Sequence, residues 1–173
     1  MLQGEPVVLT DMLDCRERRA RKQDEYRNKY HTTIISFCMN IPGPIKTNAD
    51  ITRVFHSGVH EIQQYLGNAH IAVLDSVEYN EKTGNELILA VDCKDSKRIK
   101  DAMTNIEETH PIGRLFDIDV LDPDGNKMSR NTFRKCFICN CQAQECASRR
   151  RHSVPEMQEY LDSKIQEYLS SDK

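Results

Sequence analysis

The sequence has no long apolar run and no tryptophan. Its longest uninterrupted apolar stretches, such as Leu87–Val91, are far too short to span a bilayer. The N-terminal stretch MLQGEPVVLTD lacks the basic region and the apolar core that a secretory signal carries. These absences argue against a membrane or secreted protein, and we expect a cytoplasmic protein with no membrane partner.

The chain also lacks a marked excess of charge of one sign. It has 24 lysines and arginines against 27 aspartates and glutamates, and its formal net charge is −3. This balance argues against a general nucleic-acid binder, so we expect no nucleic-acid partner. Residues 126–152, however, contain seven lysines and arginines and one acidic residue, Glu145. Such a local positive field favours a phosphate-bearing ligand or an acidic protein partner, although a solvated basic surface has the same composition.

Internal repeats and low-complexity linkers are missing as well. A chain of 173 residues is long enough for one domain with a hydrophobic core. We therefore expect a single domain over residues 1–173. Within it, an α+β core at 10–125 would be followed by a cysteine-rich segment and a C-terminal helix at 126–173.

Hydrophobic periodicity predicts the element order β-α-β-β-α-β in the middle of the chain, which is the split βαβ arrangement of ferredoxin-like folds. The predicted fold is α+β: a mostly antiparallel sheet of about four strands, with an N-terminal helix and a C-terminal Cys-rich and helical extension. A sheet extended by further strands, as in nucleotidyltransferase folds, is the alternative. The predicted strands lie at 31–40, 70–79, 86–93 and 113–121, with the turn-rich NEKTGN as a hairpin loop between the second and third; the predicted helices lie at 10–30, 48–66 and 95–108, and from the capping-box pattern at 153–156 onward.

Two aspartates stand two residues apart in the last predicted strand. Because side chains alternate along a strand, Asp117 and Asp119 emerge on one face, while Phe116, Ile118 and Val120 point to the core. Neighbouring carboxylates repel each other unless a cation lies between them. Oxygen ligands favour Mg²⁺ or Mn²⁺, and such an ion can also hold substrate phosphates. The alternative interpretation is a strand whose polar face is simply hydrated.

Several cations could neutralise a bound phosphate. Arg114 and Arg130 flank the aspartate strand, and Lys46 follows the stiff Pro-Gly-Pro loop. In the first predicted helix, three polar side chains at i, i+3 and i+7 share one face, which a solvated helix would also show. These three side chains are Arg16, Arg19 and Gln23.

Four of the seven cysteines lie close together after residue 135. Cys136 and Cys139 have the C-x₂-C spacing that lets two thiolates bind one metal, and Cys146 and His152 follow. Four nitrogen and sulfur ligands would form a closed, structural zinc site, in which Cys141 is surplus. The alternative is a set of reduced cysteines that are buried as small apolar side chains.

Four segments together resemble the apo-citrate lyase phosphoribosyl-dephospho-CoA transferases, also called citrate lyase holo-acyl-carrier-protein synthases. The segment HPIGRLFDIDVLD is long enough to be specific, whereas a bare D-x-D is not. Cys141 has no counterpart in the family's cysteine pattern. The four segments are CRERRARKQ in the first helix, PGPIK at 42–46, HPIGRLFDIDVLD at 110–122, and SR followed by RKCFIC…C…H at 129–152.

The resemblance implies an enzyme that modifies another protein covalently. Family members transfer the phosphoribosyl-dephospho-CoA group from 2′-(5″-triphosphoribosyl)-3′-dephospho-CoA to a serine of the citrate lyase acyl carrier (gamma) subunit. Diphosphate is released and apo-citrate lyase is activated. Because the serine oxygen would attack the α-phosphorus, the reaction is a nucleotidyl transfer.

The resemblance also assigns expected roles to residues of this chain. Asp117 and Asp119 would hold Mg²⁺ on the triphosphate and, with Arg114 and His110, form the catalytic group. His110 or a metal-bound aspartate would accept the serine proton. The basic segment 126–152 would dock the carrier subunit if that partner is acidic. The expected substrate-binding residues are Lys46, Arg16, Arg19, Gln23 and Arg130.

Two other functions remain open from the sequence. One is a related nucleotidyltransferase that acts on another carrier, such as that of malonate decarboxylase. The other is a non-catalytic, zinc-dependent adaptor, for which substitution of Asp117 and Asp119 would change little.

Overall fold

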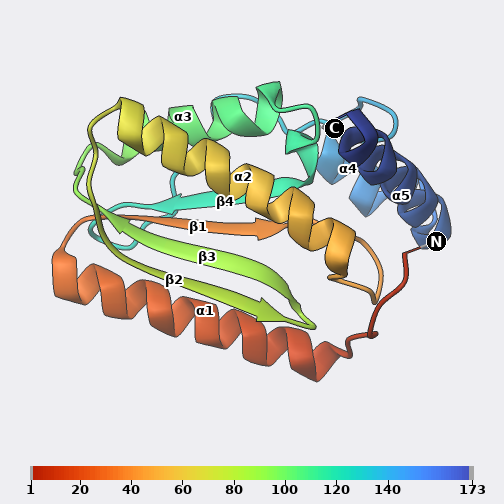
Figure 1. The fold of residues 1–173 in the computed structure, drawn as a ribbon, viewed down its shortest axis with the longest axis horizontal. Helices are drawn as coiled ribbons and strands as arrows, with labels where there is room; N and C mark the ends of the chain where they lie inside the picture. Colours follow the sequence, from red (N-terminus) through yellow and green to blue (C-terminus); the bar gives the residue numbers. More distant parts are fainter. Residues whose placement is uncertain (1, 172–173) are drawn as a thin grey trace.

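The computed structural model describes residues 2–171 and shows an α+β fold built on a four-stranded antiparallel sheet (Figure 1). The strand order is β2-β3-β1-β4, and the predicted β-α-β-β-α-β order is confirmed. The strands are β1 (Thr33–Met39), β2 (Val73–Glu81), β3 (Gly84–Val91) and β4 (Phe116–Leu121); the helices are α1 (Leu9–Tyr30), α2 (Ala49–Asn68), α3 (Ser96–Thr109), α4 (Ala143–Ser148) and α5 (Val154–Ser171), with a short 3₁₀ helix η1 (Gly113–Leu115) before β4.

The main hydrophobic core lies between one face of the sheet and the helices α2, α3 and α5. Phe37 of β1 stacks on Phe55 of α2 with ring centroids 4.8 Å apart, and meets Phe116 of β4 edge-on at 5.2 Å. Leu161 and Ile165 of α5 are buried in the same core. The C-terminal helix therefore packs into the body of the molecule, at the end of the sheet where β1 finishes and β4 begins (Figure 1).

Helix α1 lies against the opposite face of the sheet. Tyr26 packs with Ile34 of β1 and Ile88 of β3 in a small second core. The hydroxyls of Tyr26 and Tyr30 donate hydrogen bonds to Asp75 of β2, at 3.1 and 2.7 Å. These contacts attach α1 over β1, β2 and β3, whereas β4 lies at the far edge of the sheet.

The outer edge of β4 has no neighbouring strand within residues 2–171, yet side chains and a loop occupy its backbone groups. Glu107 of α3 accepts the Ile118 N–H at 2.7 Å, and Lys100 of α3 donates to the Ile118 carbonyl at 2.8 Å. The Met128 N–H donates to the Val120 carbonyl at 2.8 Å. The Glu107 and Lys100 side chains are buried, so this edge is covered by helix α3 and by the segment that follows the strand.

Two predicted boundaries are wrong for local reasons. The predicted loop NEKTGN is a hairpin turn of only two residues between β2 and β3. The turn is this short because Gly84 adopts a positive φ of 116° and pairs directly with Glu81. The strand predicted at 113–121 begins only at Phe116. Gly113 approaches the backbone of α3 so closely that a Cβ would lie 2.6 Å from the Glu107 carbonyl oxygen, and the chain turns there before it extends.

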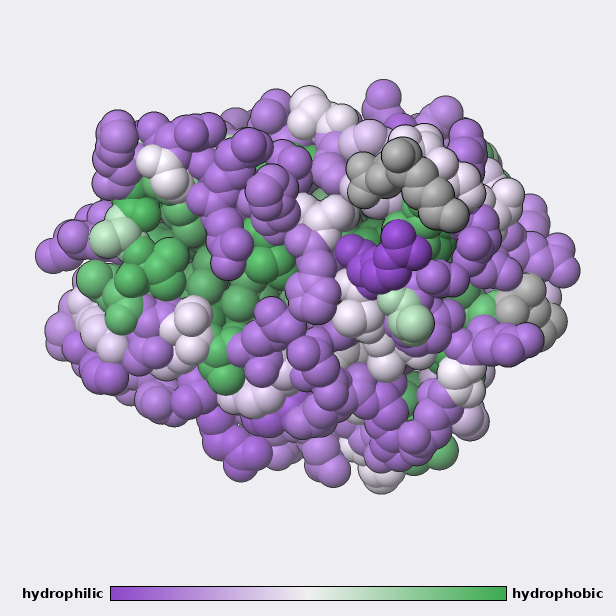
Figure 2. Space-filling view, viewed as in Figure 1, coloured by the Kyte–Doolittle hydropathy of each residue, from purple (hydrophilic) through white to green (hydrophobic). Residues whose placement is uncertain are grey.

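Polar side chains cover most of the molecular face in Figure 2, and apolar atoms gather over the sheet between α1 and α2. Val73 and Leu74, at the start of the edge strand β2, are among the exposed apolar side chains. Within the described residues, no helix is long and apolar enough to cross a membrane.

Candidate active site and metal centre

The predicted pair of aspartates shares one face of β4. The antiparallel register places Asp117 beside Cys38 of β1 and Asp119 beside Ser36. The intervening Ile118 is fully buried on the opposite face. The Asp117 side chain is 39% exposed and the Asp119 side chain 27% exposed, so a ligand can reach both carboxylates from solvent.

Each aspartate has a cationic partner from the segment that follows β4. The Arg134 guanidinium lies 3.0 Å from an Asp117 carboxylate oxygen, and the Lys127 ammonium lies 2.8 Å from an Asp119 oxygen. Arg134 also donates to the carbonyl oxygen of Phe116. The site thus combines carboxylates that could bind a metal ion with cations that could bind phosphate.

A cavity of about 410 Å³ opens over this pair of aspartates. This volume falls in the range of small-molecule sites, and charged groups dominate the lining. The lining residues are Lys100, Glu107, Asp117, Asp119, Lys127, Met128, Ser129, Arg130 and Arg134.

A third carboxylate on the same face, Glu86, was missed by the sequence reasoning. Cys38 pairs with Asp117 on one side and with Glu86 of β3 on the other, so the three residues form one row across the sheet. Glu86 is only 2% exposed and accepts hydrogen bonds from Arg18, at 3.1 Å, and from Arg19, at 2.7 Å. In the sequence Glu86 merely opens a strand, and only the register with Cys38 and the cover of α1 reveal its burial.

Arg19, predicted to bind substrate, binds this buried acid and lies near Cys38. Burial would lower the pKa of Arg19, but Cys38 once it has ionised, and the Glu86 carboxylate, raise that pKa overall, so the guanidinium stays charged. Burial also raises the pKa of the Cys38 thiol to about 12, which keeps it protonated. The row across the sheet therefore contains a fixed cation and a neutral thiol beside Asp117.

The other predicted substrate-binding residues from the N-terminal half have no described contact with the Asp117–Asp119 pair and do not line its cavity. Lys46 donates to the Ile41 carbonyl at 2.6 Å, and burial together with the charge of Arg16 lowers the pKa of its ammonium. Gln23 is half-buried one turn after Arg19 on α1. The structure thus brings Arg16 and Lys46 into electrostatic contact.

Arg114 and His110, predicted as catalytic, do not contact the aspartates. Arg114 donates to the Cys136 carbonyl at 2.8 Å and to the Asn140 side-chain oxygen at 2.6 Å. It therefore holds the segment 134–152, which we call the cysteine segment. The His110 ring packs against Phe116, with centroids 4.8 Å apart, and Phe116 belongs to the core on the other face of the sheet. His110 is therefore separated from the carboxylates by β4 itself.

Arg130, also predicted to bind substrate, lines the aspartate cavity but is held by acids of α3. Its guanidinium lies 3.4 Å from Glu107 and 3.1 Å from Glu108. Burial raises the pKa of Glu107, although Arg134, the Ile118 N–H and other cations oppose that shift. The arrangement fixes Arg130 at the wall of the cavity.

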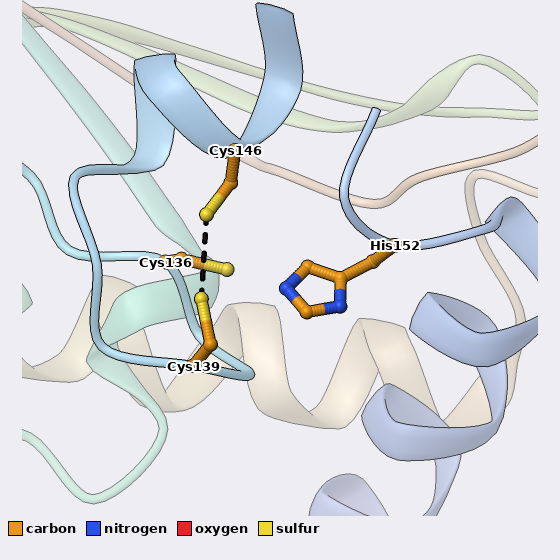
Figure 3. A group of neighbouring side chains, drawn as sticks. All are labelled: Cys136, Cys139, Cys146 and His152. Atoms are coloured by element: carbon orange, nitrogen blue, oxygen red, sulfur yellow. Dashed lines mark hydrogen bonds between the residues drawn. The ribbon is translucent and has the colours of Figure 1, made fainter. Parts of the chain in front are cut away.

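The predicted metal ligands come together in a second site, at the other end of the basic segment. One donor atom from each of Cys136, Cys139, Cys146 and His152 lies within 4.8 Å of all the others, and Figure 3 shows the four side chains pointing toward a common centre. The Cys139 and Cys146 sulfurs are 3.3 Å apart. Cys141 is outside the group and accepts a hydrogen bond from Arg151 at 3.5 Å.

The imidazole of His152 is oriented as a metal ligand would be. Its Nδ1 lies 3.3 Å from a Glu156 carboxylate oxygen. Within residues 2–171 its buried Nε2 makes no hydrogen bond of acceptable geometry, although Cys139 lies close enough to raise the pKa of His152. An orphaned buried nitrogen is costly, and a metal among the three thiols would satisfy it while Glu156 orients the ring. The donor set S₃N fits zinc.

Open carboxylates among cations, with a separate Cys/His cluster that could hold a metal ion, are typical of a protein that binds an anionic ligand. Comparison with known proteins narrows this class. The family model described as "Apo-citrate lyase phosphoribosyl-dephospho-CoA transferase" matches residues 7–168. The chain belongs to this family.

Curated proteins from several bacteria are similar to the chain over nearly their whole length. A probable apo-citrate lyase phosphoribosyl-dephospho-CoA transferase of Vibrio cholerae serotype O1 (strain M66-2) is 36% identical over 93% of this chain and 90% of its own. A second probable apo-citrate lyase phosphoribosyl-dephospho-CoA transferase, from Streptococcus pyogenes serotype M18, is 35% identical over 98% of this chain and 91% of its own. The apo-citrate lyase phosphoribosyl-dephospho-CoA transferase of Citrobacter koseri is 32% identical over 87% of this chain and 84% of its own.

Proposed function

We propose that this protein is a cytoplasmic nucleotidyltransferase that activates apo-citrate lyase. It transfers phosphoribosyl-dephospho-CoA from 2′-(5″-triphosphoribosyl)-3′-dephospho-CoA to a serine of the acyl carrier subunit. Family membership supports the reaction. The observation that carries the mechanism is the open pair Asp117 and Asp119, with Arg134 and Lys127 at 3.0 and 2.8 Å. The alternatives, a malonate decarboxylase carrier or an adaptor without catalysis, find no support in the comparisons.

Asp117 and Asp119 are the residues proposed to hold Mg²⁺, because their oxygens share one accessible face. When bound, the ion would neutralise phosphate charge and polarise the phosphoryl oxygens. Arg134 and Lys127 would then release the aspartate oxygens and bind oxygens of the triphosphate. Arg19 would add a third cation. The negative charge that develops on the departing diphosphate would thus meet cations already in position.

In the proposed reaction, the serine oxygen forms a bond to the α-phosphorus while the bond from that phosphorus to the diphosphate oxygen breaks. The serine proton must leave at the same time. A carboxylate of the Asp117–Asp119 pair is the proposed acceptor, because His110 packs on the other face of β4. The diphosphate leaves bound to the cations on the wall of the cavity.

The Cys136, Cys139, Cys146 and His152 centre is proposed to bind a structural Zn²⁺. The converging donors and the unpartnered His152 nitrogen support this assignment. Zinc would fix the segment from residue 126 onward against the core at 10–125. It would thereby set the positions of Arg134 and Lys127, which belong to the same segment.

A transfer assay tests the proposed function. The purified protein, the triphosphoribosyl donor, Mg²⁺ and apo-citrate lyase are mixed, and the mass of the carrier subunit and the released diphosphate are followed. Asp117→Asn and Asp119→Asn should each lower the rate by about a hundredfold or more with little loss of folding. Asp124→Asn, in the exposed turn after β4, is the matched control and should stay near wild type. A carrier that gains no mass would sink the proposal.

A further inference from the structure

A second, more apolar groove adjoins the aspartate cavity. It has a volume of about 620 Å³ and lies between the loop after β1, the cysteine segment, α4 and the start of α5. One side of the zinc centre forms part of its wall, because Cys136, Cys146 and His152 line it. The apolar lining residues are Pro42, Phe137, Ala143, Ala147, Val154 and Met157, and we call this space the pantetheine groove.

The rim of the pantetheine groove is cationic. Arg114, Arg134, Lys135 and Arg150 line it, and no aspartate or glutamate is among its described lining residues. Among residues 2–171, the Arg114 guanidinium donates to two neutral oxygens, those of Cys136 and Asn140, and to no carboxylate. Lys135 and Arg150 have no ion-pair partner within residues 2–171. The groove therefore carries uncompensated positive charge beside an apolar floor, which fits an amphipathic anion.

The groove is continuous with the proposed reaction centre through Arg134. This side chain lines both spaces and binds Asp117 at 3.0 Å. A ligand with one phosphate group at the aspartates can therefore extend past Arg134 without leaving the protein surface. The ligand must be long, must carry a second anionic group, and must end in a largely uncharged chain.

We propose that the pantetheine groove binds the dephospho-CoA half of the donor, with its 5′-diphosphate at the cationic rim and its pantetheine arm along the apolar floor. The identity of the ligand rests on the proposed function. Dephospho-CoA has the required chemistry, since a diphosphate joins its adenosine to a long neutral arm. The pocket volume and its apolar lining suit such an arm.

Equilibrium binding of dephospho-CoA and ADP to the full-length, zinc-loaded protein tests this inference, because ADP keeps the diphosphate and lacks the arm. The wild type should bind dephospho-CoA about tenfold or more tightly than ADP. Ala147→Trp fills the groove from an exposed helical position and should reduce that ratio to about one. Ala20→Trp, on the exposed side of α1, is the control and should keep the ratio.

A charge variant tests the rim separately. Arg150→Glu should weaken dephospho-CoA and ADP alike, about tenfold, because both carry the diphosphate. Val154→Glu places a carboxylate on the apolar wall at the first turn of α5, where a helix tolerates acid, and should weaken dephospho-CoA more than ADP. Circular dichroism and zinc content confirm folding of each variant.

An unchanged dephospho-CoA to ADP ratio in Ala147→Trp and Val154→Glu would overturn the inference, as would a wild type without preference. If the same variants weaken binding of the apo-carrier alone while dephospho-CoA binding stays constant, the groove belongs to the carrier and the inference is wrong. The measurement needs no transfer. Dephospho-CoA binding without carrier modification would therefore count against the proposed function and not against the groove.

Discussion

Glu86 is a buried carboxylate whose charge is balanced by Arg18 and Arg19 of α1. A buried ion pair costs desolvation, and removal of one member leaves the other charge uncompensated. Glu86 and Arg19 therefore hold each other in place, and Arg19 is fixed close to Cys38, beside Asp117. Glu86 acts as a positioning residue, because its own oxygens are occupied by arginines.

Glu86→Gln should misplace Arg19 and leave its guanidinium without an acid, while Arg18 keeps Glu81. We expect the KM for the triphosphoribosyl donor to rise about tenfold with a smaller change in kcat, and the free energy of unfolding to fall by ~1–3 kcal/mol, since the arginines are partly solvated. Steady-state kinetics and urea unfolding measure the two effects.

Glu81→Gln is the matched control for this substitution. Glu81 also pairs with Arg18, at 2.5 Å, but is 48% exposed, so its loss should cost less than about 1 kcal/mol and leave KM unchanged. Equal effects of the two substitutions would show that burial of Glu86 is unimportant for positioning.

Strand periodicity was sufficient to predict that Asp117 and Asp119 share a face, because alternation is a property of the backbone. It could not place residues whose surroundings depend on packing. His110 follows α3 directly, and only the packing of its ring on Phe116 shows that it lies on the core side of β4. The sequence likewise gave no sign that Arg114 would bind the backbone of the cysteine segment.

At the level of elements, the C-terminal half of α1 is attached to the sheet through Asp75 of β2. Tyr26, Tyr30 and Lys29 all reach this carboxylate. The hydrogen bond from Tyr30, followed by those from Lys29, the Ser76 N–H and Tyr26, lowers the pKa of Asp75 to about 2. Asp75 thus contributes to the attachment of α1 in its ionised form.

This attachment should depend on pH. Because the folded pKa of Asp75 is below the unfolded value of about 3.9, its stabilisation is present above pH ~4 and is lost as the pH falls toward 2. Asp75→Asn should therefore lower Tm clearly at pH 6 and by a much smaller amount at pH 2. Asp101→Asn, an exposed member of an i,i+4 pair on α3, should leave Tm close to wild type at both pH values. A constant difference between wild type and Asp75→Asn across this range would contradict the argument.

The elements themselves were largely predictable, because their stripes and alternations are regular. The capping box predicted at the start of the last helix is confirmed, since the Glu156 N–H donates to the Ser153 hydroxyl at 3.2 Å and the Ser153 N–H to Glu156 at 3.3 Å. The start of β4 could not be predicted from the sequence, because the close approach of Gly113 to α3 is a tertiary contact.

Across the whole molecule, the cysteine segment links the sheet to the C-terminal helix. Arg114 binds it from η1, Arg134 reaches from it to Asp117, and His152 leads into α5. A metal at its centre would thus act on stability and on the active-site cations together. The spacing of the ligands was visible in the sequence, whereas the exclusion of Cys141 follows only from the folded loop.

Zinc content and its loss test this link. Protein purified without chelator should contain about one zinc per chain by elemental analysis. Cys139→Ser should lose the metal, lower Tm and slow transfer, because Arg134 and Lys127 lose their support. Cys141→Ser is the matched control and should keep all three properties. A metal-free wild type, or equal metal loss in both variants, would refute the assignment.

The buried Lys100 and Glu107 side chains on the outer edge of β4 have a consequence for solubility. An edge strand that presents its aspartates to solvent is also a template on which another polypeptide could add a strand and aggregate. The ammonium and carboxylate of α3 occupy the backbone groups that such a strand would need, while the aspartate side chains stay accessible. Access to the aspartates and resistance to aggregation thus depend on different sides of the same strand, because its face is open to solvent and its edge is closed.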